Sequence, residues 1–91
     1  MKIIAVCGMG IGTSVLLKMN TEKVLELLGV QAEVQAADMA KAKREGAEAD
    51  IILTTPELVF QLEHMPGIIV PIEHVFDLTE IRQKLSNVFG Q

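Results

Sequence analysis

Short apolar runs alternate along this chain with longer segments in which apolar residues recur every three or four positions. Residues 2–6, 50–54 and 68–70 are apolar runs of the length that buried strands have. Residues 30–37 are more polar and predict a strand at the edge of a sheet. Because strand and helix patterns alternate, we predict an α/β fold. It forms one domain over residues 1–91, an open four-stranded parallel sheet with helices on both faces.

The first helix is predicted between the first two strands. It begins near Gly12, and Gly29 stands where a glycine would end it. Helical spacing predicts one broad apolar face, as in a helix that packs on a core. The residues of that face are Val15, Leu16, Met19, Val24, Leu27 and Leu28.

Three further helices are predicted from the residues that begin and end them. Short polar side chains accept hydrogen bonds from the first N–H groups of a helix, and proline fits its first position. Asp38 precedes a helix predicted over residues 39–45, which ends at Gly46. Thr55 and Pro56 begin a helix predicted over residues 56–64, which Pro66 and Gly67 break. A capping box of Asp77 and Glu80 begins the final helix, whose predicted buried stripe is Ile81, Leu85, Val88 and Phe89.

The segment between the first strand and the first helix carries the candidate chemistry. It reads Cys7-Gly8-Met9-Gly10-Ile11-Gly12-Thr13-Ser14. Its three glycines let backbone N–H groups approach and surround a small anion, and the helix contributes its positive end. A thiol there is expected to have a lowered pKa, whereas a cysteine without such a loop is usually a small buried hydrophobe. We therefore predict that Cys7 carries a phosphoryl-sized group and that residues 8–14 cradle it.

The side chains of this loop have two interpretations each. Thr13 and Ser14 are predicted to donate hydrogen bonds to the thiolate or to phosphoryl oxygens, or else to cap the helix. Met9 and Ile11 are expected to face outward as a docking patch for partners, or else to fold back onto the core.

In a parallel sheet, ligands bind beyond the carboxyl ends of the strands, near the switch in strand order. Cys7 follows the first strand, Thr54 and Thr55 end the third, and residues 71–77 follow the fourth. We expect these three segments to rim one site. The arrangement is Rossmann-like or flavodoxin-like, with a phosphatase-type phosphate loop (P-loop) after the first strand.

Two histidines and one basic cluster remain. His74 follows the fourth strand and could reach the rim of the site, whereas His64 is expected to interact with a helix end. Lys41, Lys43 and Arg44 are expected to form a solvated helix face.

Composition excludes several classes of function. The net charge of −4 without a marked basic patch argues against binding to nucleic acid or to anionic membranes. The absence of Trp and Tyr argues against a site that stacks bases or sugars on aromatic side chains. A single cysteine excludes an intrachain disulfide framework and is typical of the cytoplasm. No apolar run reaches membrane-spanning length, so no membrane insertion is expected. The residues imply no metal and no cofactor.

The spacing of the loop distinguishes it from other phosphate loops. Its glycines do not follow the dinucleotide-binding fingerprint, and the lysine of the nucleotide P-loop is missing. Its closest chemical counterpart is the cysteine phosphatase loop Cys-x5-Arg, but Thr13 occupies the arginine position and no Asp-Pro pair supplies a general acid. These absences favour a phosphocysteine that persists until an acceptor takes the phosphoryl group.

The opening strand, the Cys-Gly-x-Gly-x-Gly-Thr-Ser loop and the helix resemble IIB subunits of the bacterial phosphoenolpyruvate-dependent sugar phosphotransferase system (PTS). The ascorbate/galactitol branch is the nearest match, ahead of the lactose/cellobiose branch, whose chains are usually longer. The resemblance implies a cytoplasmic phosphotransferase, peripherally associated with a membrane transporter. Cys7 would accept a phosphoryl group from a phosphohistidine of a IIA partner and donate it to a sugar held by a membrane IIC partner.

Three alternatives stay open on the residues alone. A small phosphatase-like or arsenate-reductase-like enzyme is one, although further cysteines for arsenate reduction are missing. A regulatory anion-binding domain is another. A single-cysteine redox sensor is the third.

Overall fold

The computed structural model describes residues 1–8 and 11–90, apart from the side chain of Ile11. Met9 and Gly10 of the predicted cradle, and the predicted orientation of the Ile11 side chain, therefore lie outside the described residues. The elements are β1 (Lys2–Val6), α1 (Ile11–Leu28), β2 (Glu33–Ala37), α2 (Met39–Glu45), the 3₁₀ turn η1 (Gly46–Glu48), β3 (Ile51–Thr54), the 3₁₀ turn η2 (Pro56–Leu58), α3 (Val59–Leu62), β4 (Ile68–Pro71) and α4 (Leu78–Phe89).

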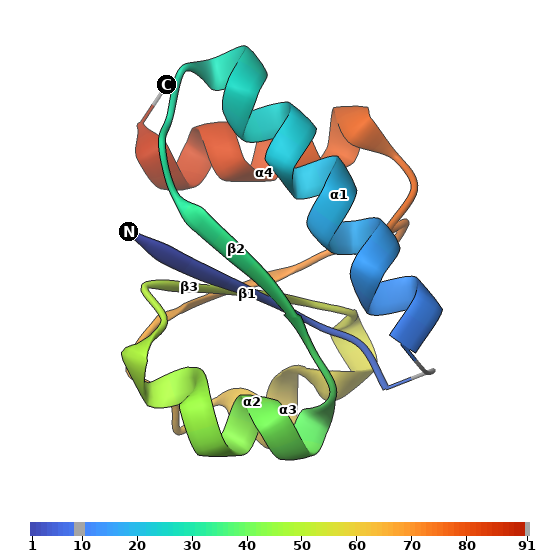
Figure 1. Ribbon diagram of the computed structural model, residues 1–91, viewed down its shortest axis with the longest axis vertical. Helices are drawn as coiled ribbons and strands as arrows, with labels where there is room; N and C mark the ends of the chain where they lie inside the picture. Colours follow the sequence, from blue (N-terminus) through green and yellow to red (C-terminus); the bar gives the residue numbers. More distant parts are fainter. Residues whose placement is uncertain (9–10, 91) are drawn as a thin grey trace.

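The four strands form one parallel sheet in the order β2-β1-β3-β4 (Figure 1). Parallel neighbours need crossover connections, and the intervening helices supply them. α1 and α4 cover one face of the sheet, and α2 and α3 cover the other. The predicted four-stranded parallel α/β fold, with β2 at an edge, is confirmed.

The sheet divides the core into two apolar layers. Alternate residues of a strand point to opposite faces. Ile3, Ala5 and Cys7 pack with residues of α1 and α4, whereas Ile4 and Val6 pack on the other face with residues of α2 and α3. All five are at most 2% exposed, which is typical of a central strand in a doubly covered sheet.

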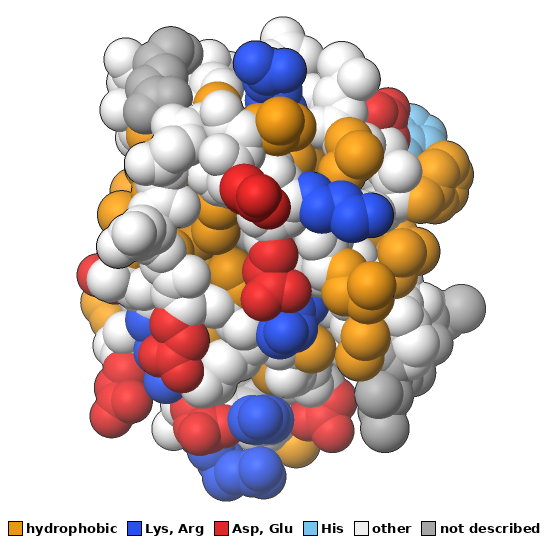
Figure 2. All heavy atoms as spheres, turned by 45° about the horizontal axis from the view of Figure 1, so that its top comes forward, with side chains coloured by type: hydrophobic (Ala, Val, Ile, Leu, Met, Phe, Trp, Pro, Cys, Tyr) orange, Lys and Arg blue, Asp and Glu red, His pale blue; other side chains and the backbone are white. Residues whose placement is uncertain are grey.

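The predicted apolar face of α1 is largely wrong. Of its six residues, Val24 is buried and Leu28 partly buried, but Val15, Leu16, Met19 and Leu27 are 39–64% exposed. The helix instead buries a different side, which includes Leu17 and Leu25. An apolar residue occurs on nearly every side of this helix, so its spacing alone did not indicate which side meets the sheet. Figure 2 shows hydrophobic side chains gathered along one side of the face that α1 and α4 form.

The helix predicted over residues 56–64 is shorter and less regular than expected. A 3₁₀ turn over Pro56–Leu58 precedes a single turn of α-helix over Val59–Leu62. Thr55 and Pro56 occupy the predicted N-cap and first helical positions, but the Thr55 side chain makes no capping hydrogen bond. Its hydroxyl instead donates a hydrogen bond of 2.8 Å to Glu57 Oε1.

The other helix ends agree better with expectation. Gly29 adopts the left-handed conformation with φ of 71°, and the Asp38 carboxylate accepts a hydrogen bond from the N–H of Lys41. Asp77 caps α4, but the predicted capping box is only half formed. Glu80 does not return a hydrogen bond to the N–H of Asp77, which donates to the carbonyl of His74 instead. Among the described helices, none is both long enough and apolar enough to cross a bilayer.

Candidate functional site

Cys7 lies at the point where the strand order of the sheet reverses. It follows β1, whose last residue, Val6, pairs with Ala37 of β2 on one side and Thr54 of β3 on the other. Ligands of open α/β sheets bind at such switch points, beyond the carboxyl ends of the strands. The register therefore sets Cys7 at the predicted site, immediately before the loop that leads into α1.

The expected acidic thiol is not what the structure shows. Cys7 is only 2% exposed, and burial raises the pKa of its thiol above the ordinary value. The negative charge of Glu57 raises this pKa further. Burial disfavours a thiolate because the charge loses its hydration. The prediction of a lowered thiol pKa rested on the helix end and the glycines and did not include the loss of hydration on burial.

The start of α1 forms the described wall of the predicted phosphate cradle. The first N–H groups of a helix have no partner within the helix, and they open toward its amino end. Ser14 is 3% exposed and Thr13 is half-buried, both in the first turns of α1. The structure thus brings these two predicted residues to the helix end that follows Cys7.

The described loop glycines are not required by packing. A Cβ on Gly12 would meet nothing within 4 Å, and one on Gly8 would make ordinary contact, at 3.4 Å, with Leu58. Neither residue has the positive φ that favours glycine. A role for these glycines in close approach to phosphate stays a prediction.

The end of β3 lies beside the strand that leads to Cys7, as the sequence predicts for Thr54 and Thr55. Thr54 is fully buried, and its hydroxyl has no hydrogen-bond partner among residues 1–8 and 11–90. The Thr55 hydroxyl donates a hydrogen bond to the Glu57 carboxylate, and this bond lowers the pKa of the Glu57 carboxyl. Glu57 and Leu58 fall within the helix that the sequence predicts over residues 56–64, without a role at the site. Their position two and three residues after Thr55, which was expected at the rim of the site, was the signal that could have indicated them.

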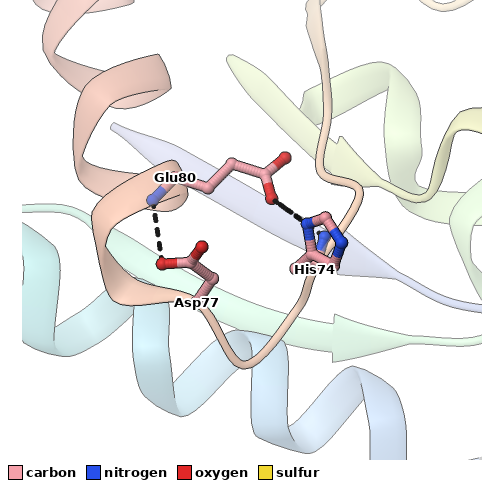
Figure 3. Close-up of side chains that lie close together, drawn as sticks. All are labelled: His74, Asp77 and Glu80. Atoms are coloured by element: carbon pink, nitrogen blue, oxygen red, sulfur yellow. Dashed lines mark hydrogen bonds and ion pairs between the residues drawn. The ribbon is translucent and has the colours of Figure 1, made fainter.

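Glu80 ties the loop after β4 to α4 (Figure 3). Its carboxylate accepts hydrogen bonds from the N–H groups of Glu73 at 2.7 Å and His74 at 2.9 Å, and it pairs with Lys84 at 2.7 Å. His74 Nδ1 lies 3.2 Å from Glu80 Oε1. Burial alone would raise the pKa of Glu80, but the hydrogen bonds from Lys84, Glu73 and His74 outweigh it and lower the pKa to about 2.

Replacing Glu80 by glutamine should lower the free energy of unfolding at pH 7 by about 2 kcal/mol, because a neutral amide loses the charge-assisted hydrogen bonds. The native pKa of about 2 lies below the ordinary 4.5. The stabilisation is therefore complete above pH 4.5 and disappears as the pH falls toward 2. Urea unfolding of both proteins at a series of pH values checks this. A difference that stays constant down to pH 2 would contradict it.

His74, Asp77 and Glu80 form the one group of possible metal ligands among the described residues, with donor atoms within 4.8 Å of one another. Asp77 already accepts backbone hydrogen bonds as the cap of α4, and Glu80 takes part in the four hydrogen bonds above with Glu73, His74 and Lys84. We therefore interpret the group as the hydrogen-bond network of this loop. Asn20 Nδ2 adds a hydrogen bond of 2.9 Å to the carbonyl of Val75.

The remaining candidates lie elsewhere. His64 is exposed in the turn after α3, which leads back toward the amino end of β4 and away from Cys7. Lys43 and Arg44 are exposed on α2, and Lys41 lies 4.0 Å from Glu45. The exposed side chains agree with the predicted solvated face.

Sequence comparison gives the family of the chain. Residues 2–87 match the family described as "PTS system, Lactose/Cellobiose specific IIB subunit". The "Ascorbate-specific PTS system EIIB component" of Mycoplasma pneumoniae is 39% identical over 87 residues, which are 94% of this chain and 92% of that protein.

Two solved structures share the fold. The lactose-specific IIB component domain from Streptococcus pneumoniae superposes with a TM-score of 0.67 at 17% identity, over 99% of this chain and 95% of that one. A YwlE mutant from Bacillus subtilis superposes with a TM-score of 0.51 at 16% identity, over 97% and 90%. At these identities the structures show the fold alone. The family match and the Mycoplasma relative show that this chain belongs to the lactose/cellobiose-type IIB family and is a IIB component of a sugar phosphotransferase system.

Proposed function

We propose that this IIB component is a phosphocysteine carrier. Cys7 accepts a phosphoryl group from a phosphohistidine of a IIA partner and donates it to a sugar held by a membrane IIC partner. The observation that carries the proposal is the position of Cys7 at the switch point of the sheet, directly before the amino end of α1. Backbone N–H groups and the positive helix end favour a bound phosphoryl group there. The protein would act in the cytoplasm, beside its transporter.

Both transfers balance without a metal or an organic cofactor. In the first, the N–P bond of phosphohistidine breaks, an S–P bond forms at Cys7, and the thiol proton ends on the histidine nitrogen. In the second, the S–P bond breaks, an O–P bond forms on the sugar, and the hydroxyl proton returns to the thiol. The raised pKa of the Cys7 thiol fits a group that holds its proton until a donor docks. Stabilisation of the moving charge falls to the N–H groups of residues 8–14.

A phosphatase-like enzyme is the alternative, since the spacing Cys-x5-Thr-Ser is close to that of the cysteine phosphatase loop. The residues argue against it: Thr13 stands in the arginine position, and no Asp-Pro pair is present. A regulatory anion-binding domain would bind phosphate without needing the thiol. We favour ascorbate as the sugar, because the Mycoplasma relative carries that specificity in its name.

The test is intact-protein mass spectrometry after incubation with phosphoenolpyruvate, the general phosphotransfer proteins and a IIA partner. A single acid-labile phosphoryl adduct that maps to Cys7 is expected. Subsequent addition of membranes that contain the IIC partner, with ascorbate, lactose or cellobiose, should discharge the adduct with the true substrate only. An adduct on His64 or His74, or none with several IIA partners, would contradict the proposal.

The exposed apolar residues of α1 are proposed as part of the IIA-docking surface. Val15, Leu16 and Met19 are 39–50% exposed and lie within the first three turns after the cysteine loop. A phosphohistidine must come within bonding distance of Cys7, which is buried, so its protein must cover the start of α1. Apolar surface beside a reactive centre is typical of a contact for such a partner.

Replacing Met19 by glutamine should raise the KM for the phosphorylated IIA partner roughly five- to tenfold and leave kcat unchanged, since an interface residue of this size contributes about 1 kcal/mol. Leu27→Gln is the matched control. Leu27 is 64% exposed on the same helix, eight residues further from Cys7. Steady-state transfer assays measure both variants, and equal effects on KM would contradict the assignment.

A further inference from the structure

Glu57 is bound to the end of β3, the strand next to the one that Cys7 follows. Val6 and Thr54 pair in neighbouring strands, so Cys7 and Thr55, one residue further, leave the sheet side by side. Thr55 Oγ1 donates a hydrogen bond of 2.8 Å to Glu57 Oε1. This bond keeps the carboxylate near the strand end from which Cys7 also emerges.

Leu58 ties the same segment to the cysteine loop. A Cβ built on Gly8 would lie 3.4 Å from Cδ1 of Leu58, so the leucine side chain is in van der Waals reach of the residue after Cys7. Glu57 thus stands between Thr55, which binds its carboxylate, and Leu58, which approaches the loop. The hydrogen bond from Thr55 restricts where its charge can be.

Three other charged groups on the surrounding elements have partners of their own. Such pairing reduces the field that each of them exerts at Cys7. These groups are Asp38, which caps α2; Lys18, paired with Glu22 on α1; and His74, bound to Glu80.

We propose that Glu57 is a positioning residue that acts on Cys7 through its charge and prevents phosphocysteine from accumulating. The inference rests on the proposed carrier function. Phosphorylation replaces a neutral thiol by a group with a charge of about −1.5 to −2. A fixed carboxylate disfavours that state, and transfer to a sugar hydroxyl relieves the repulsion. The contribution of Glu57 to the raised pKa of the thiol has the same physical origin.

Alkylation of Cys7 by iodoacetamide tests the charge effect without any partner. In Glu57→Gln the thiol should react roughly two- to fivefold faster at pH 7, and the midpoint of the rate against pH should move down. The glutamine oxygen can still accept from Thr55, so the segment keeps its geometry. The difference should shrink at about 1 M salt, where the Debye length is only about 3 Å. Glu63→Gln is the control, an exposed acid at the end of α3.

Equilibration with a phosphorylated IIA partner tests the effect on transfer. At the same donor ratio, the ratio of phosphorylated to free Cys7 should be roughly three- to tenfold higher in Glu57→Gln than in the wild type, and unchanged in Glu63→Gln. Glu57→Asp, which keeps the charge, should lie near the wild type.

The outcomes separate this inference from the carrier function. An unchanged alkylation profile in Glu57→Gln, or the same change in Glu63→Gln, overturns the charge effect. A shifted profile with an unchanged phosphorylation ratio overturns the role in transfer. In a third outcome the alkylation profile shifts, but neither the wild type nor any variant accepts a phosphoryl group from any donor. The carrier function is then wrong, and so is the role of Glu57 in transfer, whereas its charge effect on the thiol is demonstrated.

Discussion

Serine in place of Cys7 is expected to abolish the phosphoryl adduct and to slow transfer from the IIA partner at least about a thousandfold. A serine hydroxyl ionises far less readily than a thiol and attacks phosphorus more weakly, and neither histidine of the chain is placed to activate it as a general base. Histidine is the usual base, but His74 is tied to Glu80 and His64 lies in the turn after α3. The donor should remain phosphorylated, which mass spectrometry measures directly.

The fold must be monitored in the same experiment, because Cys7 is 2% exposed. A buried hydroxyl without a partner costs about 1–3 kcal/mol, so Cys7→Ser is expected to unfold at somewhat lower urea concentration. Cys7→Ala, which introduces no polar atom, serves as the second variant. Both should be inactive while folded by circular dichroism. Transfer by folded Cys7→Ala above a tenth of the wild-type rate would disprove the phosphocysteine mechanism.

Alanine in place of Gly67 is expected to lower the free energy of unfolding by about 3 kcal/mol, at the upper end of the range for overpacking. The added Cβ would lie 2.5 Å from the carbonyl oxygen of Ala49 and 3.2 Å from that of Asp50. Both atoms belong to backbone and cannot turn aside. The next N–H, of Ile68, donates a 2.9 Å hydrogen bond to the Asp50 carbonyl at the start of the β3–β4 pairing. The clash would therefore push β4 away from β3.

Thermal unfolding measures this effect, with a fall in Tm of about 15 °C expected for a domain of this size. Gly12→Ala is the matched control, because a Cβ there meets nothing within 4 Å. In the first turn of α1 the exchange should leave stability unchanged or raise it by up to about 1 kcal/mol. If both variants unfold at the same temperature, the close approach of Gly67 to the two carbonyls does not make glycine necessary at this position.

Most of the fold was predictable because its signals are local. The apolar runs that became β1, β3 and β4, the glycine that ends α1 and the aspartates that cap α2 and α4 all act within a few residues of themselves. Alternation of strands and helices then leaves few arrangements besides a parallel sheet. The same order places Cys7 beyond a strand end and before a helix, so the candidate site was also determined by the sequence.

Only the tertiary structure decided the electrostatics and the surface. Whether the thiol of Cys7 is solvated depends on residues of β3 and α1 that pack around it, and the charge of Glu57 reaches it from a segment fifty residues away in the chain. Which side of α1 meets the sheet depends on shape complementarity, since apolar residues occur on nearly all its sides. Burial and electric fields arise from contacts between distant residues, and spacing along a chain does not contain them.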